Sequence, residues 1–149
     1  MMSKIQEKTM EGYKETELGV LPESWKVVKI GDLAEVKYGK TKPKTEGDIP
    51  VVGSGGIYAK TDKPLVDFQT IVIGRKGTAG KTWLFFEPCY PSDTTFYLKW
   101  KKEVDVSFIY NYMTLNPLSG EHAKTTLPSF DIFNYFPSNA SFTNLSACI

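Results

Sequence analysis

Between Ile49 and Trp100 the chain is a series of short apolar segments separated by glycine and proline, and this pattern restricts the fold more than any other feature. Such segments, rich in β-branched and aromatic side chains and bounded by turn-forming residues, are typical of β-strands. The five predicted strands are IPVV, IYAK, TIVIG, TWLFF and TTFYLKW. Their connections are shorter than the roughly dozen residues that a βαβ crossover needs, so neighbouring strands are expected to pair in an antiparallel or mixed sheet.

An amphipathic helix is predicted after the last of these strands. The segment VDVSFIYNYMTLN places Val106, Ile109, Tyr110 and Met113 three and four residues apart, which is the spacing of one buried helical face. We expect this helix to cover one face of the sheet and to end at Asn116 and the proline that follows.

A short strand, WKVVKI, and a helical turn, GDLAEV with Asp32 near its start, are predicted before the series begins. Trp25, Ile30 and Leu33 are expected to be core residues, because large apolar side chains usually lie inside. Together these elements predict an α+β fold, with a twisted mixed or antiparallel β-sheet and flanking helices.

The length of 149 residues suits one domain. Residues 1–16 are polar and lack an apolar period, so they are predicted to form a flexible N-terminal arm, with the domain spanning 17–132. Residues 133–149 carry no charged side chain in a chain whose charged fraction is 23%. Such a tail suits neither an amphipathic helix nor a solubilising segment.

Several classes of protein are excluded by composition. Cys89, Cys148 and the single His122 provide neither a metal-ligand set nor a disulfide framework, so no metal and no cofactor are predicted. The N-terminal residues lack the apolar core of a signal peptide, and no segment approaches the roughly 20 apolar residues of a membrane span. We therefore expect a cytoplasmic protein.

Positive charge is unevenly distributed although the net charge is only +1. Of the 18 basic residues only Arg75 is an arginine, and four lysines fall within one eight-residue stretch: Lys37, Lys40, Lys42 and Lys44. This lysine-rich loop is interpreted either as a surface that faces phosphates or as a solvated loop that keeps the chain soluble.

The glycine-rich segment GRKGTAGKT, residues 74–82, resembles a nucleotide-binding loop but departs from it. Arg75 stands where that motif requires glycine, and a strand follows where the motif requires a helix. Its glycines permit tight turns, while Arg75, Lys76 and Lys81 place positive charge on one loop. Contact with guanine and phosphates is one interpretation, and a simple hairpin turn is the other.

A second glycine-rich turn, GSGGIY, offers Ser54 as a donor or acceptor and Tyr58 for stacking or packing. Neither turn is accompanied by a catalytic set, because there is no serine elbow, no second histidine and no methyltransferase-like glycine fingerprint. An enzyme acting on a nucleotide or nucleic acid would require ATP or metal dependence that these residues do not predict.

Four segments resemble, in order, the specificity subunits of type I restriction-modification systems. The opening YKETELGVLPESWKVVKIGDLAEVKYGK, the turn GDIPVVGSGGIYA, the stretch TIVIGRKGTAGKTWLFFEPCYPSDTTFYL and the segment AKTTLPSFDI are each similar to family motifs. The resemblance covers roughly residues 13–132. It implies a single target-recognition domain that reads about half of a split DNA site and carries no catalysis.

The resemblance also implies partners. Modification and restriction subunits would supply methylation, ATP hydrolysis and cleavage, and double-stranded DNA would be the ligand. A homodimer is left open. The candidate DNA-binding residues are Arg75, Lys76, Lys81, Lys40, Lys42 and Ser54.

One departure from the family concerns the C-terminal residues. After LPSFDI the family continues into an "IPLPP"-like strand and a long charged spacer helix, whereas this chain continues with FNYFPSNASFTNLSACI. A truncated or frameshifted product without the coiled-coil spacer helix is the resulting hypothesis. The alternative function is a remnant that contacts modification subunits without reading DNA.

Overall fold

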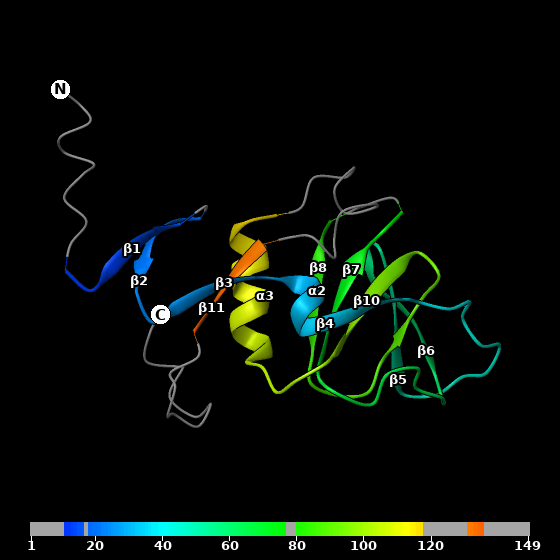
Figure 1. Ribbon diagram of the computed structural model, residues 1–149. Coiled ribbons are helices and arrows are strands. Elements are labelled where there is room, and N and C mark those ends of the chain that lie inside the picture. The colour runs from blue at the N-terminus through cyan, green and yellow to red at the C-terminus, as the bar shows by residue number, and fades with distance from the viewer. Residues whose placement is uncertain (1–10, 17, 77–79, 118–130, 136–149) are drawn as a thin grey trace.

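The computed structural model describes residues 11–16, 18–76, 80–117 and 131–135 (Figure 1). The strands before the central sheet and the helix that leads into it are β1 (Tyr13–Thr16), β2 (Gly19–Pro22), β3 (Trp25–Lys29) and α2 (Ile30–Leu33). The remaining elements are β4 (Ala34–Tyr38), β5 (Ile49–Gly53), β6 (Gly56–Thr61), β7 (Thr70–Gly74), β8 (Thr82–Phe85), β9 (Tyr90–Pro91), β10 (Thr95–Trp100), α3 (Val106–Leu115) and β11 (Asp131–Tyr135).

The central sheet has four antiparallel strands in the order β4-β10-β7-β8. Strand β7 is buried along its whole length. Ile71 and Ile73 belong to the larger core cluster, which also contains residues of α2 and α3, while Val72 packs with Val52 and Val66 in a second cluster. A strand covered on both faces reads as a continuous apolar run, which is why TIVIG shows no alternation.

A smaller, mixed sheet in the order β6-β5-β9 contributes to the second cluster. Strand β5 pairs antiparallel with β6, through an irregularity between Val51 and Val52, and parallel with β9. The predicted α+β class with mixed and antiparallel pairing is therefore confirmed. The longest helix in the described residues is α3, with 10 residues.

Helix α3 covers one face of the central sheet, as predicted (Figure 1). Its first turn is capped by Asp105, whose carboxylate accepts a hydrogen bond from the Phe108 backbone N–H at 2.9 Å. Tyr112 is buried together with the predicted Val106, Ile109 and Met113, and the half-buried Tyr110 packs at the margin of the cluster; the C-cap is Asn116, as predicted.

Three details differ from the sequence-based expectations. Tyr13–Thr16, assigned to the flexible arm, form β1 and pair with β2, because Gly19 adopts a positive φ of 107° that turns the chain into a hairpin. Residues 133–135, assigned to the tail, belong to β11, which pairs with β3. Trp25 is half-buried rather than a core residue, and its ring meets the edge of Phe108 at a centroid distance of 6.4 Å.

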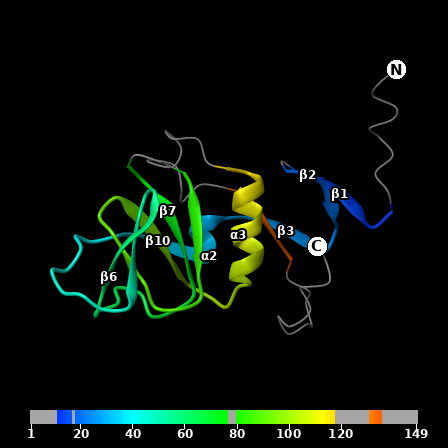
Figure 2. The same ribbon diagram turned by 180° about the vertical axis from the view of Figure 1, so that it is seen from behind.

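Figures 1 and 2 show an elongated arrangement of these parts. The β1–β2 hairpin lies at one end and the β5–β6 hairpin at the other, with α3 between the β3–β11 pair and the central sheet. The strand ends next to Tyr38, Gly74, Lys81 and Thr95 meet at one edge of the central sheet, since their registers align these positions. The lysine-rich loop and the 74–82 loop start from this edge, whereas the GSGG turn joins β5 and β6 of the smaller sheet.

Candidate nucleic-acid interface

The carbonyl group of Thr94, in the turn between β9 and β10, holds two glycine-rich loops together. Its oxygen accepts hydrogen bonds from the backbone N–H groups of Arg75 at 2.9 Å and Lys76 at 3.2 Å. It also accepts one from the Ser54 hydroxyl at 2.5 Å. The start of the 74–82 loop and the GSGG turn are therefore fixed to one acceptor, although they are separated along the chain.

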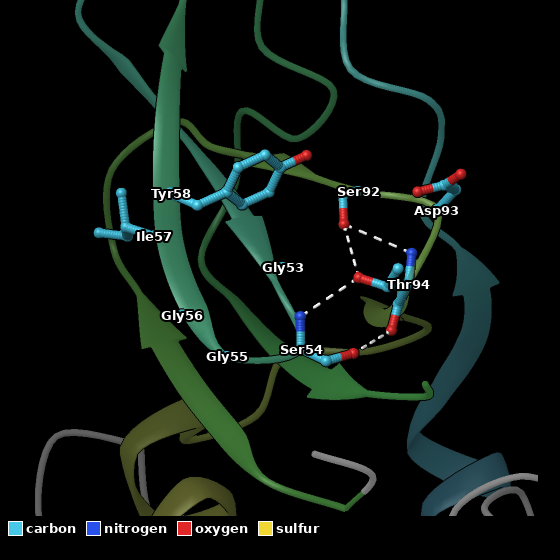
Figure 3. A pocket seen from close by; sticks show the side chains of 9 residues that line it. All are labelled: Gly53, Ser54, Gly55, Gly56, Ile57, Tyr58, Ser92, Asp93 and Thr94. Carbon is cyan, nitrogen blue, oxygen red and sulfur yellow. Dashed lines mark hydrogen bonds between the residues drawn. The ribbon is translucent and has the colours of Figure 1, made fainter. Parts of the chain in front are cut away.

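The hydroxyl of Thr94 completes this network (Figure 3). Its Oγ1 accepts a hydrogen bond from the Ser54 backbone N–H at 3.2 Å and lies 2.9 Å from the Ser92 hydroxyl. The Ser92 N–H in turn donates to the Val52 carbonyl at 2.8 Å. Ser54, Ser92 and Thr95 are buried, so these polar groups are bonded to one another instead of to water.

Residues 91–95, which include Thr94, are called the 91–95 turn. The first residues of the lysine-rich loop are hydrogen-bonded to this turn. Gly39 donates its N–H to the Thr95 carbonyl at 3.0 Å, and Lys40 donates its N–H to the Pro91 carbonyl at 3.1 Å. A Cβ atom at Gly39 would lie 1.8 Å from the Ser92 carbonyl oxygen. Only glycine permits this approach of the two backbones.

Tyr90 forms a hydrogen bond with the next part of the lysine-rich loop. The Tyr90 hydroxyl donates to the Thr41 carbonyl at 2.8 Å. Burial, with a further contribution from Tyr58, raises the pKa of Tyr90, so that the hydroxyl keeps the proton it donates. Lys40, on one side of Thr41, is exposed, and Lys42, on the other, is half-buried.

Arg75, at the start of the 74–82 loop, packs against Tyr38, the last residue of β4. Its guanidinium carbon is 4.8 Å from the centre of the Tyr38 ring and 5.8 Å from that of Phe96, and its Nη1 donates to the Asp93 carbonyl at 3.2 Å. Stacking on an aromatic face and one hydrogen bond fix the orientation of the group. A guanidinium has five N–H donors, and among the described residues one hydrogen bond, to the Asp93 carbonyl, uses them.

The remaining charges of the 74–82 loop are more exposed. Lys76 projects from the surface, and the Lys81 ammonium nitrogen lies 5.5 Å from the centre of the Trp83 ring. Trp83 in turn lies beside the GSGG turn, since a Cβ at Gly56 would be 3.6 Å from the Trp83 Nε1 atom. The hairpin β7–β8 and the hairpin β5–β6 are thereby in contact at this edge.

Residues of the GSGG turn, of the start of β6 and of the 91–95 turn line a hollow of about 370 Å³ (Figure 3). It is lined by Gly53, Ser54, Gly55, Gly56, Ile57, Tyr58, Ser92, Asp93 and Thr94. Large apolar side chains stand exposed around this edge: Ile57 is 58%, Tyr58 59% and Tyr38 60% accessible. Exposed aromatic groups beside cations are a combination that suits nucleic acid.

The structure brings most of the predicted residues to one edge. Arg75, Lys76, Lys40 and Ser54 are attached to the 91–95 turn, and Lys81 lies at the other end of the 74–82 loop. Ser54 has a different position from the one expected, because its hydroxyl donates inward to Thr94 and its side chain is only 7% accessible. Its direct role here is to hold the two turns together.

Four residues of this edge were not identified from the sequence: Tyr38, Ser92, Asp93 and Thr94. Ser92, Asp93 and Thr94 are consecutive in the 91–95 turn, whereas Tyr38 ends β4, and the pairing of β4 with β10 brings these two segments together. The one available signal was the "dt" of the family stretch that resembles Asp93 and Thr94. Lys37, counted with the lysine-rich loop, pairs with Glu35 at 3.2 Å. His122 and Cys148 lie outside the described residues.

The described residues contain no cluster of three or more histidine, cysteine or acidic side chains that could hold a metal ion. Burial raises the pKa of the Cys89 thiol to about 12, so this cysteine is a packing residue of the second cluster at neutral pH. Within the described part of the chain, no helix has the length and apolar character needed to cross a membrane.

Lysine and arginine side chains gathered at one edge of a fold are a recurrent feature of nucleic-acid-binding domains. The family model of the type I restriction modification DNA specificity domain matches residues 22–132, most of the chain, and the chain belongs to this family. Specificity domains of this family are in general not catalytic. Comparison with curated protein sequences gave no significant match.

Solved structures share the fold. The S subunit of a type I restriction-modification system from M. genitalium superposes with a TM-score of 0.64 at 17% identity, over 76% of this chain and 35% of that chain. The HsdS subunit from Thermoanaerobacter tengcongensis gives 0.58 at 14% identity, over 89% and 38%. A chain from a structure of type I restriction-modification complex assembly and conformational transition gives 0.60 at 16% identity, over 88% and 41%.

The chain is much shorter than the solved chains that it matches. It spans between 35% and 41% of the length of the solved chains it matches. At such identities the likeness is one of fold.

Replacing Thr94 by valine should destabilise the domain by roughly 1–3 kcal/mol, because the Ser54 N–H and the buried Ser92 hydroxyl lose their partner without a change of shape. Chemical denaturation measures this difference. The control is Thr114→Val, which removes an exposed helical hydroxyl that donates to Tyr110. Equal unfolding free energies for the two variants would show that the network contributes nothing.

Replacing Gly39 by alanine should cost at least about 2 kcal/mol or displace the lysine-rich loop, since the new methyl group would overlap the Ser92 carbonyl. Gly55→Ala is the matched control, because a Cβ there meets nothing within 4 Å. Thermal unfolding compares the two. A Gly39→Ala protein as stable as Gly55→Ala would contradict the close approach of the loop to the turn.

Proposed function

We propose that this chain is the DNA-reading module of a type I restriction-modification system and recognises about half of a split duplex site. Modification and restriction subunits would dock elsewhere and be directed to that site. Methylation, ATP hydrolysis and cleavage would belong to those subunits, in the cytoplasm where the DNA lies, and this chain would need no cofactor of its own.

One observation carries the proposal: the 91–95 turn holds the only arginine and the start of the lysine-rich loop at the same edge of the sheet. Chain segments around Gly39, Ser54 and Arg75 all bond to this turn. A single rigid support for separate loops suits recognition, because contacts that are fixed before binding lose less entropy on binding.

The side chains at this edge divide into two roles. The Arg75 guanidinium stacks on the Tyr38 ring. Its two parallel N–H donors match the O6 and N7 acceptors of guanine in the major groove. Lys40, Lys42, Lys76 and Lys81 would neutralise backbone phosphates on either side. Phosphate contacts set affinity and position, whereas base contacts set the sequence that is read.

The Arg75→Ala variant should lose roughly 1–3 kcal/mol of affinity for the preferred duplex and become less selective, because it loses the bidentate base contact. Arg75→Lys should keep the affinity for random duplex and lose the preference, since a lysine retains the charge without the fork. Fluorescence anisotropy with both duplexes, at several salt concentrations, separates these effects.

Lys63→Ala is the control for this experiment. It removes an exposed lysine beyond Thr61, at the opposite end of the β5–β6 hairpin from the GSGG turn. Unchanged affinity and preference in Arg75→Ala would overturn the groove assignment. A chain that captures a modification subunit but binds no duplex at low salt would instead support the remnant function.

A further inference from the structure

The carboxylate of Asp93 belongs to the proposed DNA-reading edge. Asp93 is exposed at the tip of the 91–95 turn, and among the described residues no hydrogen bond or ion pair involves its carboxylate. Arg75 donates to the backbone carbonyl of Asp93 and not to its side chain. An acidic group beside Arg75, Lys76 and Lys40 therefore requires an explanation.

The usual reason for aspartate in a turn does not apply. Aspartate commonly closes turns by accepting from a backbone N–H two residues on. Here Ser92 performs that role, because its Oγ accepts from the Thr94 N–H at 3.4 Å and its carbonyl accepts from Thr95 at 3.1 Å. The Asp93 side chain is left to face outward at the margin of the hollow (Figure 3).

Tyr58 stands across Ser92 from Asp93 in the same view (Figure 3). Its ring lies against Gly53, where a Cβ would be 3.1 Å from two ring atoms, so the glycine allows the ring to sit at this place. The hollow between Tyr58 and Asp93 thus has one aromatic wall, one acidic wall and a floor of hydrogen-bonded Ser54, Ser92 and Thr94.

A carboxylate on a DNA-binding surface selects strongly among the groups it can meet. It is repelled by phosphates and by the acceptor atoms of guanine and thymine, and it is matched by an exocyclic amino group of a base. In the major groove cytosine N4 and adenine N6 carry such groups, and aspartate pairs most characteristically with cytosine.

We propose that Asp93 is a specificity-determining residue that accepts a hydrogen bond from the exocyclic amino group of a base, cytosine before adenine, while Tyr58 packs against the neighbouring base. This inference rests on the proposed function. Arg75 and Asp93, joined through the Asp93 carbonyl, then present a donor fork and an acceptor side by side, which together match the two bases of a G·C pair.

The test uses the full chain and selection from randomised duplexes at low salt, followed by measurement of single sites. The wild-type chain should prefer an amino-bearing base at one position by on the order of tenfold, and Asp93→Ala, which removes the acceptor, should lose this preference. Asp62→Ala is the charge-matched control, because it removes an exposed carboxylate beyond β6, away from the hollow. Asp93→Ala should gain affinity for random duplex and change the sequence read, whereas Asp62→Ala should change neither.

Base analogues identify the group that Asp93 meets. Pyrimidin-2-one lacks the 4-amino group of cytosine, and purine lacks the 6-amino group of adenine. Replacing the selected base by its analogue should cost the wild-type chain about tenfold in Kd and cost Asp93→Ala little. Loss with purine in place of adenine would assign adenine as the base; loss with pyrimidin-2-one would assign cytosine.

The outcomes distinguish this inference from the proposed function. If the wild-type chain selects a sequence and Asp93→Ala, with an unchanged unfolding temperature, selects the same sequence, the Asp93 inference fails and the proposed function stands. If the wild-type chain selects no sequence, both fail.

Discussion

The carbonyl oxygen of Thr94 is the point on which the arrangement of loops depends. Three donors converge on it, two from the backbone of the 74–82 loop and one from Ser54 of the GSGG turn. A single oxygen with three donors constrains more than three separate bonds would, because the loops cannot move independently. The contact of Gly39 with the same turn extends this constraint to the lysine-rich loop.

This constraint explains why a chain of nearly neutral charge can offer a basic recognition surface. The surface is basic because of where its cations lie and not because of the total charge. Arg75 and Lys40 are both bonded through their backbones to the 91–95 turn, while the charge of Lys37 is paired with Glu35. The guanidinium of Arg75 is also oriented in advance by Tyr38, Phe96 and the Asp93 carbonyl. Such preorganisation reduces the entropy lost on binding.

The elements that could be predicted from sequence are those whose pattern reflects burial. TIVIG is buried on both faces and contains only β-forming residues before its glycine, and α3 has one apolar face at helical spacing. Tyr13–Thr16 could not be recognised, because this strand is stabilised by a hairpin turn and not by an apolar pattern. The β3–β11 pair joins Lys29 to Asp131, and such distant pairing leaves no local signal. The sequence predicts an available hydroxyl at Ser54, but this hydroxyl donates inward to the Thr94 carbonyl, and no local pattern reveals that partner.

The most direct measurement of the central claim is the reactivity of individual lysines with and without duplex DNA. Light acetylation followed by mass spectrometry reports each side chain separately, and the exposed Lys63 and Lys99 serve as internal references away from the 91–95 turn. The proposed interface predicts that duplex protects Lys40, Lys76 and Lys81 together and leaves Lys63 and Lys99 unchanged. Equal protection of all five, or protection confined to Lys63 and Lys99, would contradict it.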